Sequence, residues 1–168
     1  MLGVKNEIYT PEEIMDILSS VSDPEIPVLS IQDLGIIRGI DVSGTMPIIT
    51  ITPTYSGCPA MTVIEVEMRM ALLSAGIADF KIKTILSPPW TTDWITPNGI
   101  QKLKEYGIAP PEKSTTSKLS LFGKETEVVC PQCGSHHTEI VSRFGSTACK
   151  AMYKCLDCKE PFDYFKCI

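Results

Sequence analysis

The 168-residue sequence lacks the features of several large classes of protein. It has no run of about 18 uncharged apolar residues, which a membrane-spanning helix would require. It has no apolar signal segment near its N-terminus, so we expect a cytoplasmic protein with no membrane contact. It also has no excess of basic residues: the formal net charge is −5, with −6 in residues 1–110 and +1 in residues 111–168. Nucleic-acid binding usually needs a basic surface, so we expect none here.

Histidine is nearly absent, which limits the chemistry that the chain could perform. The only two histidines are His136 and His137. A cysteine nucleophile normally needs a neighbouring base, so a thiol enzyme would have to bring one of these two to a distant cysteine. The sequence also lacks the Gly-x-Gly-x-x-Gly nucleotide motif, the Glu-x-x-His pair of di-iron proteins and the four-cysteine run of ferredoxins. We therefore expect a chain that is not itself catalytic.

Helical and strand-like segments alternate through residues 10–107. Thr10 and Glu13 form a capping box that begins the first helix. The apolar spacing predicts strands and further helices in the order helix-strand-strand-helix-strand-helix, with strands at 36–42, 48–53 and 79–86 and later helices at 59–75 and 98–106. This order predicts a small α+β domain, a three-stranded sheet with helices on one face. We place it at residues 1–110, followed by a polar linker at 111–126.

The segment Thr54–Met61 places Cys58 in a glycine-containing turn just before a helix. Unpaired N–H groups and the positive end of the helix dipole favour a thiolate there, so Cys58 is a candidate reactive or metal-binding thiol. The alternative is an ordinary buried cysteine. An earlier proline-stiffened loop carries Asp23 and Glu25. The alternative for this loop is a solvated turn in which Asp23 caps its own backbone.

Four of the seven cysteines form two C-x-x-C pairs, Cys130/Cys133 and Cys155/Cys158, with 21 residues between the pairs. Each pair can hold two thiolates in a tight turn, and two facing turns complete a tetrahedral four-sulfur site. Gly134 permits the turn after the first pair. We predict a zinc-ribbon-like module at residues 127–168, with hairpin strands at 138–144 and 150–154. Structural zinc is favoured over an iron centre, although four thiolates also suit iron.

The remaining chemically active side chains are harder to assign. His136 and His137 could replace a cysteine ligand, but with four thiolates present the favoured interpretation is two solvated histidines. Cys149 and Cys167 keep two interpretations, buried hydrophobic residues or a second thiol pair near the metal.

Four motifs together resemble a known domain: Asp23-Pro-Glu-Ile-Pro-Val28, Asp33-Leu-Gly35, Thr52-Pro-Thr-Tyr-Ser-Gly-Cys58-Pro59 and Ser87-Pro-Pro-Trp-Thr-Thr-Asp-Trp94. Residues 10–107 resemble the iron–sulfur assembly domain of the MIP/Suf-T type. With the cysteine-bearing tail included, nearly the whole chain resembles the family of D subunits of the bacterial phenylacetate-degradation (Paa) system.

The resemblance implies a small α+β domain, often a homodimer, that helps to mature or deliver metal centres. It implies association with a multicomponent oxygenase that epoxidises the ring of phenylacetyl-CoA, whose other subunits include a di-iron catalytic subunit and an iron–sulfur flavin reductase. The family's functional cysteine corresponds to Cys58, and its acidic motif corresponds to Asp23, Glu25 and Asp33.

Two hypotheses for function follow. In the first, the chain is an accessory maturation factor of the phenylacetyl-CoA epoxidase. Cys58, with nearby carboxylates, transiently holds iron or an iron–sulfur cluster, or docks the iron–sulfur reductase as client, and the ribbon is a zinc-closed docking module. In the second, the chain is a non-catalytic structural subunit of the same oxygenase, and Cys58 is a core residue.

Overall fold

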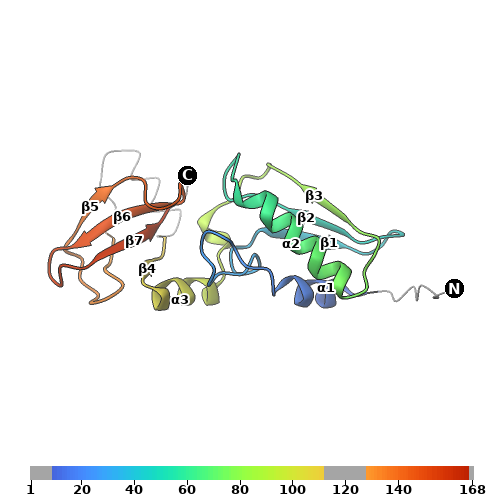
Figure 1. Ribbon diagram of the computed structural model, residues 1–168, viewed down its shortest axis with the longest axis horizontal. Helices are drawn as coiled ribbons and strands as arrows, with labels where there is room; N and C mark the ends of the chain where they lie inside the picture. Colours follow the sequence, from blue (N-terminus) through green and yellow to red (C-terminus); the bar gives the residue numbers. More distant parts are fainter. Residues whose placement is uncertain (1–8, 112–127, 167–168) are drawn as a thin grey trace.

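The computed structural model describes residues 9–111 and 128–166 and has two parts that lie side by side along its long axis (Figure 1). The first part begins with helix α1 (Pro11–Leu18). Its predicted capping box is present: the Glu13 N–H donates to Thr10 Oγ1 at 3.2 Å, and the Thr10 N–H donates to Glu13 Oε2 at 2.8 Å. These bonds satisfy two of the backbone donors that a helix start leaves without intrahelical partners.

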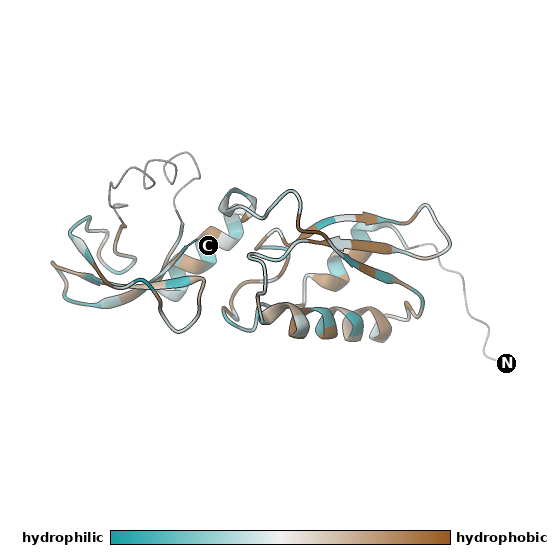
Figure 2. Cartoon of the chain, turned by 90° about the horizontal axis from the view of Figure 1, so that it is seen from above, coloured by the Kyte–Doolittle hydropathy of each residue, from teal (hydrophilic) through white to brown (hydrophobic). Residues whose placement is uncertain are grey.

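A three-stranded sheet forms the centre of the first part, in the order β1 (Ile37–Asp41), β2 (Ile48–Ile51), β3 (Lys81–Thr84). Strands β1 and β2 pair antiparallel, as a hairpin allows, whereas β2 and β3 pair parallel. A parallel pair needs a crossover, and helix α2 (Ala60–Ser74) supplies it. The sheet and α2 form two layers (Figure 2), with α1 packed beside α2. The predicted α+β class, with helices on one face, is confirmed.

The core of this part lies between the sheet and the helices. Helix α2 buries Ile64, Met68 and Leu72 completely, at spacings of four residues that place them on one side of the helix. They face β2, whose Ile49 and Ile51 are also fully buried. Each such side chain contributes roughly 1.5–3 kcal/mol of burial free energy. This packing fixes the segment between β2 and α2, which carries Cys58.

The chain leaves the first part through a 3-10 turn η1 (Thr92–Trp94) and helix α3 (Pro97–Tyr106). Trp90 is only 6% exposed, and its indole Nε1 donates to the Leu34 carbonyl oxygen at 2.8 Å. Helix α3 ends at Gly107, whose φ of 87° is the left-handed conformation that glycine tolerates best. Helix α3 lies at the end of the first part that faces the second part (Figure 1).

The second part is a four-stranded sheet in the order β4 (Ile108–Ala109), β7 (Pro161–Phe165), β6 (Lys150–Cys155), β5 (Thr138–Ser142). The predicted hairpin corresponds to β5 and β6. Strands β4 and β7 were not predicted. Strand β4 follows α3 directly and pairs parallel with β7, so residues that we assigned to the first domain complete the second sheet. The predicted linker, residues 111–126, lies outside the described residues after residue 111.

The hydrophobic core of the first part extends into the second part. Phe165 of β7 and Cys149, the residue just before β6, both pack into the core of the first part. The Phe165 ring meets Trp90 edge to face, with 6.2 Å between ring centroids. The second part keeps a small core of its own, built from Ala109, Val128, Cys130, Cys155 and Phe162. Within the described residues, no helix has the length and apolar character needed to cross a bilayer.

Candidate functional site

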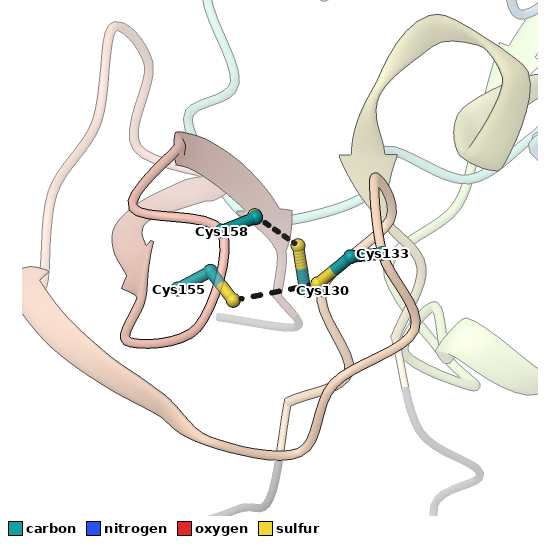
Figure 3. A group of neighbouring side chains, drawn as sticks. All are labelled: Cys130, Cys133, Cys155 and Cys158. Carbon is teal, nitrogen blue, oxygen red and sulfur yellow. Dashed lines mark hydrogen bonds between the residues drawn. The ribbon is translucent and has the colours of Figure 1, made fainter.

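The four cysteines of the two C-x-x-C pairs meet at one end of the second sheet. Their sulfur atoms all lie within 4.8 Å of one another. Cys130 and Cys133 come from the turn before β5, and Cys155 and Cys158 come from the turn that follows β6 (Figure 3). The sulfur-to-sulfur distance is 3.8 Å for Cys130–Cys158 and 3.6 Å for Cys133–Cys155. Each pair therefore faces the other across the hairpin, as the spacing predicted.

Backbone N–H groups point at the sulfur atoms of this cluster. Burial would raise the pKa of Cys155, but the N–H groups of Cys158 and Asp157 outweigh it and lower the pKa to about 6. The N–H of Glu160 is directed at Cys158, yet burial and the neighbouring thiols raise the pKa of Cys158 to about 12. Backbone donors beside Cys155 thus favour negative charge on its sulfur.

The two turns share one backbone feature. The residue directly after each second cysteine has a left-handed conformation, with φ of 74° at Gly134 and 68° at Lys159. Glycine accepts this conformation without strain, whereas a lysine pays a steric cost. Four sulfur donors in paired turns fit a thiophilic ion that prefers four-coordinate geometry. The second part thus carries a metal-binding site.

The histidines lie outside this group of four. His137 is exposed, and its Nδ1 lies 3.3 Å from Asp157 Oδ1. His136 is also exposed. Among the described residues, the four cysteines are the one group of three or more candidate ligands within 4.8 Å. Cys149 is not a neighbour of this cluster, and Cys167 lies outside the described residues.

Asp33 sits in a network of hydrogen bonds between its loop and helix α3. It is 4% exposed. Its carboxylate accepts from Lys102 Nζ at 2.6 Å, Asn98 Nδ2 at 2.8 Å, and the N–H and hydroxyl of Ser30 at 3.1 and 2.9 Å. Burial alone would raise the pKa of Asp33, but these donors, led by Lys102, lower it to about 2. Asp33 thus joins α3 to its own loop.

Asp23 caps its own loop, as one of the sequence interpretations stated, but it is buried and not solvated. It is 7% exposed, and its Oδ1 accepts the N–H groups of Glu25 at 2.7 Å and Ile26 at 2.9 Å. Burial raises its pKa, against the opposing effect of these N–H groups and of the Lys150 charge. The capped turn holds Glu25 facing the second part of the molecule.

Glu25 contacts a thiol to which the sequence pattern assigns no single role. The Cys149 Sγ–H donates to Glu25 Oε2 at 3.3 Å, and Cys149 lies 3.1 Å from Thr147 Oγ1. Burial raises the pKa of Cys149 to about 12, and Glu25 contributes in the same direction. The 124 positions that separate Cys149 from Glu25 explain why no local sequence signal could reveal the pair.

Cys58 lies two residues before α2, half-buried against the first core. The Cys58 N–H closes this turn by donating to the Tyr55 carbonyl oxygen at 3.3 Å. Burial, followed by the charge of Cys58 and a hydrogen bond with it, raises the pKa of Tyr55 to about 12. The charges of Glu25 and Cys149 act on the same phenol. Tyr55 is therefore close enough to Cys58, Glu25 and Cys149 for their charges to act on its phenol.

Two family models match the chain. The model described as an iron-sulfur cluster assembly protein matches residues 11–82, which include Cys58 and all three predicted carboxylates. The model described as a PaaD zinc beta ribbon domain matches residues 114–166, which include the four-cysteine cluster.

Curated relatives and a solved structure match either nearly the whole chain or only its first part. The chain is 49% identical over 157 residues to the D subunit of the 1,2-phenylacetyl-CoA epoxidase of Escherichia coli K12, covering 93% of this chain and 92% of that protein. It is 35% identical over 98 residues to an Fe-S protein maturation auxiliary factor of Porphyromonas gingivalis W83, covering 57% and 92%. The crystal structure of a DUF59 domain from Bacillus anthracis shares the fold, with a TM-score of 0.50, 23% identity, and coverage of 55% of this chain and 90% of that one.

Proposed function

The chain belongs to the family of phenylacetyl-CoA epoxidase D subunits, which join an iron–sulfur assembly domain to a zinc ribbon, and we propose that it matures a metal centre in a partner subunit of that epoxidase. The client that we favour is the iron–sulfur reductase. The observation that supports the proposal is the placement of Cys58, a half-buried thiol in the turn before α2 with the Tyr55 phenol close by, apart from the four-cysteine cluster. One chain thus has a closed four-sulfur site and a separate thiol that is free to exchange ligands.

We assign different roles to the three predicted carboxylates. Glu25 is half-buried and accepts a hydrogen bond from the Cys149 thiol, and we assign it a part in receiving iron or a cluster. Asp23 accepts two backbone N–H groups and orients Glu25. The Asp33 carboxylate accepts from five donors, including the Thr96 hydroxyl at 3.3 Å, so it has no spare acceptor capacity and acts as a structural clasp. Iron or the cluster is the cargo of this site and is passed on to the client.

We propose that the four-cysteine cluster holds zinc. Cys130, Cys133, Cys155 and Cys158 would bind the ion, which would close the two turns as a structural centre. The second part has a core of only a few buried side chains, so metal ligation would supply much of its stability.

The test is co-expression of the chain with the iron–sulfur reductase, followed by iron and sulfide analysis of the purified reductase. With Cys58→Ala we expect lower cluster content in the reductase, because the receiving thiol is gone. Ser56→Ala, an exposed change in the same turn, is the matched control and should leave the content unchanged. Equal cluster content with wild type and Cys58→Ala would contradict the proposal, provided that both variants melt at the same temperature.

A second function, a structural subunit of the epoxidase, is favoured by the outer side of α2. Four apolar side chains are exposed there at helical spacing: Val63, Val66, Met70 and Leu73, between 44% and 63%. Such a stripe suits a stable protein contact, with another subunit or with a second copy of the chain. Gel filtration of the co-expressed subunits separates the two functions. A stoichiometric complex that persists, with normal cluster content for Cys58→Ala, would favour the structural role.

A further inference from the structure

We propose that Asp157 is a positioning residue of the metal centre: its carboxylate connects the two cysteine-bearing turns and holds them at the spacing that a four-sulfur site requires. The inference rests on the zinc centre of the proposed function. It adds to that centre Asp157, Ser135 and His137, which do not belong to the four-cysteine cluster.

The side chain of Asp157 contacts both turns. Asp157 lies between Cys155 and Cys158 in the second turn. Its Oδ2 accepts from the hydroxyl of Ser135, and its Oδ1 lies 3.3 Å from His137 Nδ1. Ser135 and His137 come directly after the first turn. One carboxylate of the second turn therefore contacts two side chains next to the first turn.

Ser135 is itself fixed to the first turn. The Cys130 N–H donates to the Ser135 carbonyl oxygen at 2.9 Å, and the Gly134 N–H donates to the Cys130 carbonyl oxygen at 2.9 Å. The Ser135 hydroxyl also accepts the N–H of His137 at 2.9 Å. These bonds set the orientation of the hydroxyl toward Asp157. The bridge between Ser135 and Asp157 thus reaches a metal ligand, Cys130, through one backbone hydrogen bond.

The bridge lies where the strand ladder no longer connects the two turns. The pairing of β5 with β6 runs as far as Thr138 and Cys155, so Cys158 and both cysteines of the first turn lie beyond it. The Leu156 N–H adds one backbone bond, to the His137 carbonyl oxygen at 2.7 Å. The contacts of Asp157 extend this connection to the level of the cysteines. Metal sites need such support, because their ligands must be held in the correct geometry.

The charge of Asp157 allows positioning to be separated from electrostatics. A zinc ion with four thiolates carries a net negative charge, so a nearby carboxylate is repelled by the filled site. If charge were the only effect of Asp157, its removal would not weaken metal binding. If the bridge positions the turns, its removal weakens binding. The sign of the effect therefore distinguishes the two roles, even though Asp157 is 55% exposed.

The experiment uses the full chain with cobalt(II) in the four-cysteine cluster, equilibrated without oxygen against increasing chelator. Visible absorption reports the bound cobalt and its number of thiolate ligands. We expect Asp157→Ala to weaken cobalt binding about tenfold with an unchanged spectrum, since all four sulfurs remain. Ser135→Ala removes the other end of the bridge and should weaken binding similarly. The double variant should bind no more weakly than Asp157→Ala, because the same contact is lost.

Two control variants should bind cobalt within about threefold of wild type. Glu160→Ala removes an exposed carboxylate that follows the same turn, and Asp157→Asn removes the charge but keeps an acceptor oxygen for Ser135. The inference is overturned if Asp157→Ala binds cobalt as tightly as wild type, if Glu160→Ala loses as much affinity as Asp157→Ala, or if the losses of the two bridge variants add.

None of these three results contradicts the proposed zinc centre. That centre fails if the wild-type chain shows no cobalt–thiolate absorption, or if Cys130→Ser binds cobalt as tightly as wild type does. A changed spectrum in Asp157→Ala would show that Asp157 determines which ligands bind the ion and not the spacing of the turns, and it would also overturn the inference.

Discussion

The variant Asp33→Asn tests whether Asp33 has a structural role or serves as a ligand. The family resemblance places Asp33 among the functional residues, whereas its contacts join helix α3 to its own loop. Asp33 is 4% exposed, and its carboxylate accepts from Lys102, Asn98, Ser30 and Thr96. The Asp33 carbonyl oxygen also accepts the N–H of Thr96, the N-cap of α3, at 2.8 Å. Asparagine would keep the backbone contact, but it would lose the charge and place an N–H₂ group against donors.

The size of the effect follows from the pKa of Asp33. Its pKa falls from 3.8 to about 2 on folding, and each pKa unit corresponds to about 1.4 kcal/mol. The ionised Asp33 therefore stabilises the folded state by about 2–3 kcal/mol. For an acid with a lowered pKa this contribution is fully present above pH 4, and it is lost as the pH falls from about 4 to about 2. At neutral pH, Asp33→Asn should lower the melting temperature by roughly 5–10 °C.

The assay is urea unfolding at pH 7 and at pH 3, followed by tryptophan fluorescence, since Trp90 donates to Leu34 next to Asp33. The difference in free energy of unfolding between wild type and Asp33→Asn should be smaller at pH 3, because wild type has then lost part of the stabilisation by the ionised Asp33. Asp41→Asn is the matched control. Asp41 is exposed, and hydrogen bonds from Ser43 lower its pKa. Because it is exposed, Asp41→Asn should change the free energy of unfolding by no more than about 0.5 kcal/mol. An Asp33→Asn protein with wild-type stability but impaired cluster delivery would refute the clasp.

Three further predictions concern the turns and the metal site. Lys159→Gly relieves a left-handed lysine and should stabilise the metal-bound ribbon by about 1 kcal/mol, seen as slower metal loss to a chelator; faster loss would contradict this. Gly35→Ala should lower the melting temperature more than Gly57→Ala does. Both glycines have positive φ, but only at Gly35 would an added Cβ meet the Trp94 carbonyl oxygen, at 2.3 Å. Equal melting temperatures for the two variants would disprove this steric argument. Cys130→Ser should lower bound metal well below the wild-type stoichiometry in elemental analysis, and unchanged content would rule out the four-sulfur site.

Local sequence signals predicted the elements that depend on local interactions. The capping box at Thr10, the apolar spacing of α2 and the paired cysteines each specify structure within a few residues, and each is present. Strand β4 gave no such signal, because two residues have no periodicity. It is a strand only through its pairing with β7, more than 50 positions later, and a sequence pattern does not report such distant pairing.

The residues of the candidate site were also predicted only where a local sequence pattern specifies them. Cys58 and the four-cysteine cluster were predicted because a turn before a helix and two C-x-x-C pairs are local patterns. Cys149 could not be placed, since its partner Glu25 is determined by how the two parts pack. Asp33 was assigned with the functional residues by resemblance, and its role as a clasp depends on α3, which brings Lys102 to within 2.6 Å.

The packing of the ribbon against the first part connects its metal site to the loop that carries Glu25. The sequence pattern favours a ribbon that is a separate docking module, but Cys149 and Phe165 are part of the first core. Strand β6 begins at Lys150, beside Cys149, and ends at Cys155, a member of the four-cysteine cluster. Removing the ribbon metal should therefore loosen β6 and move Cys149 away from Glu25. We expect chelated protein to receive a cluster less well than the metal-loaded protein, although Cys58 itself is unchanged. Normal cluster uptake by the chelated chain would show that the two sites act independently.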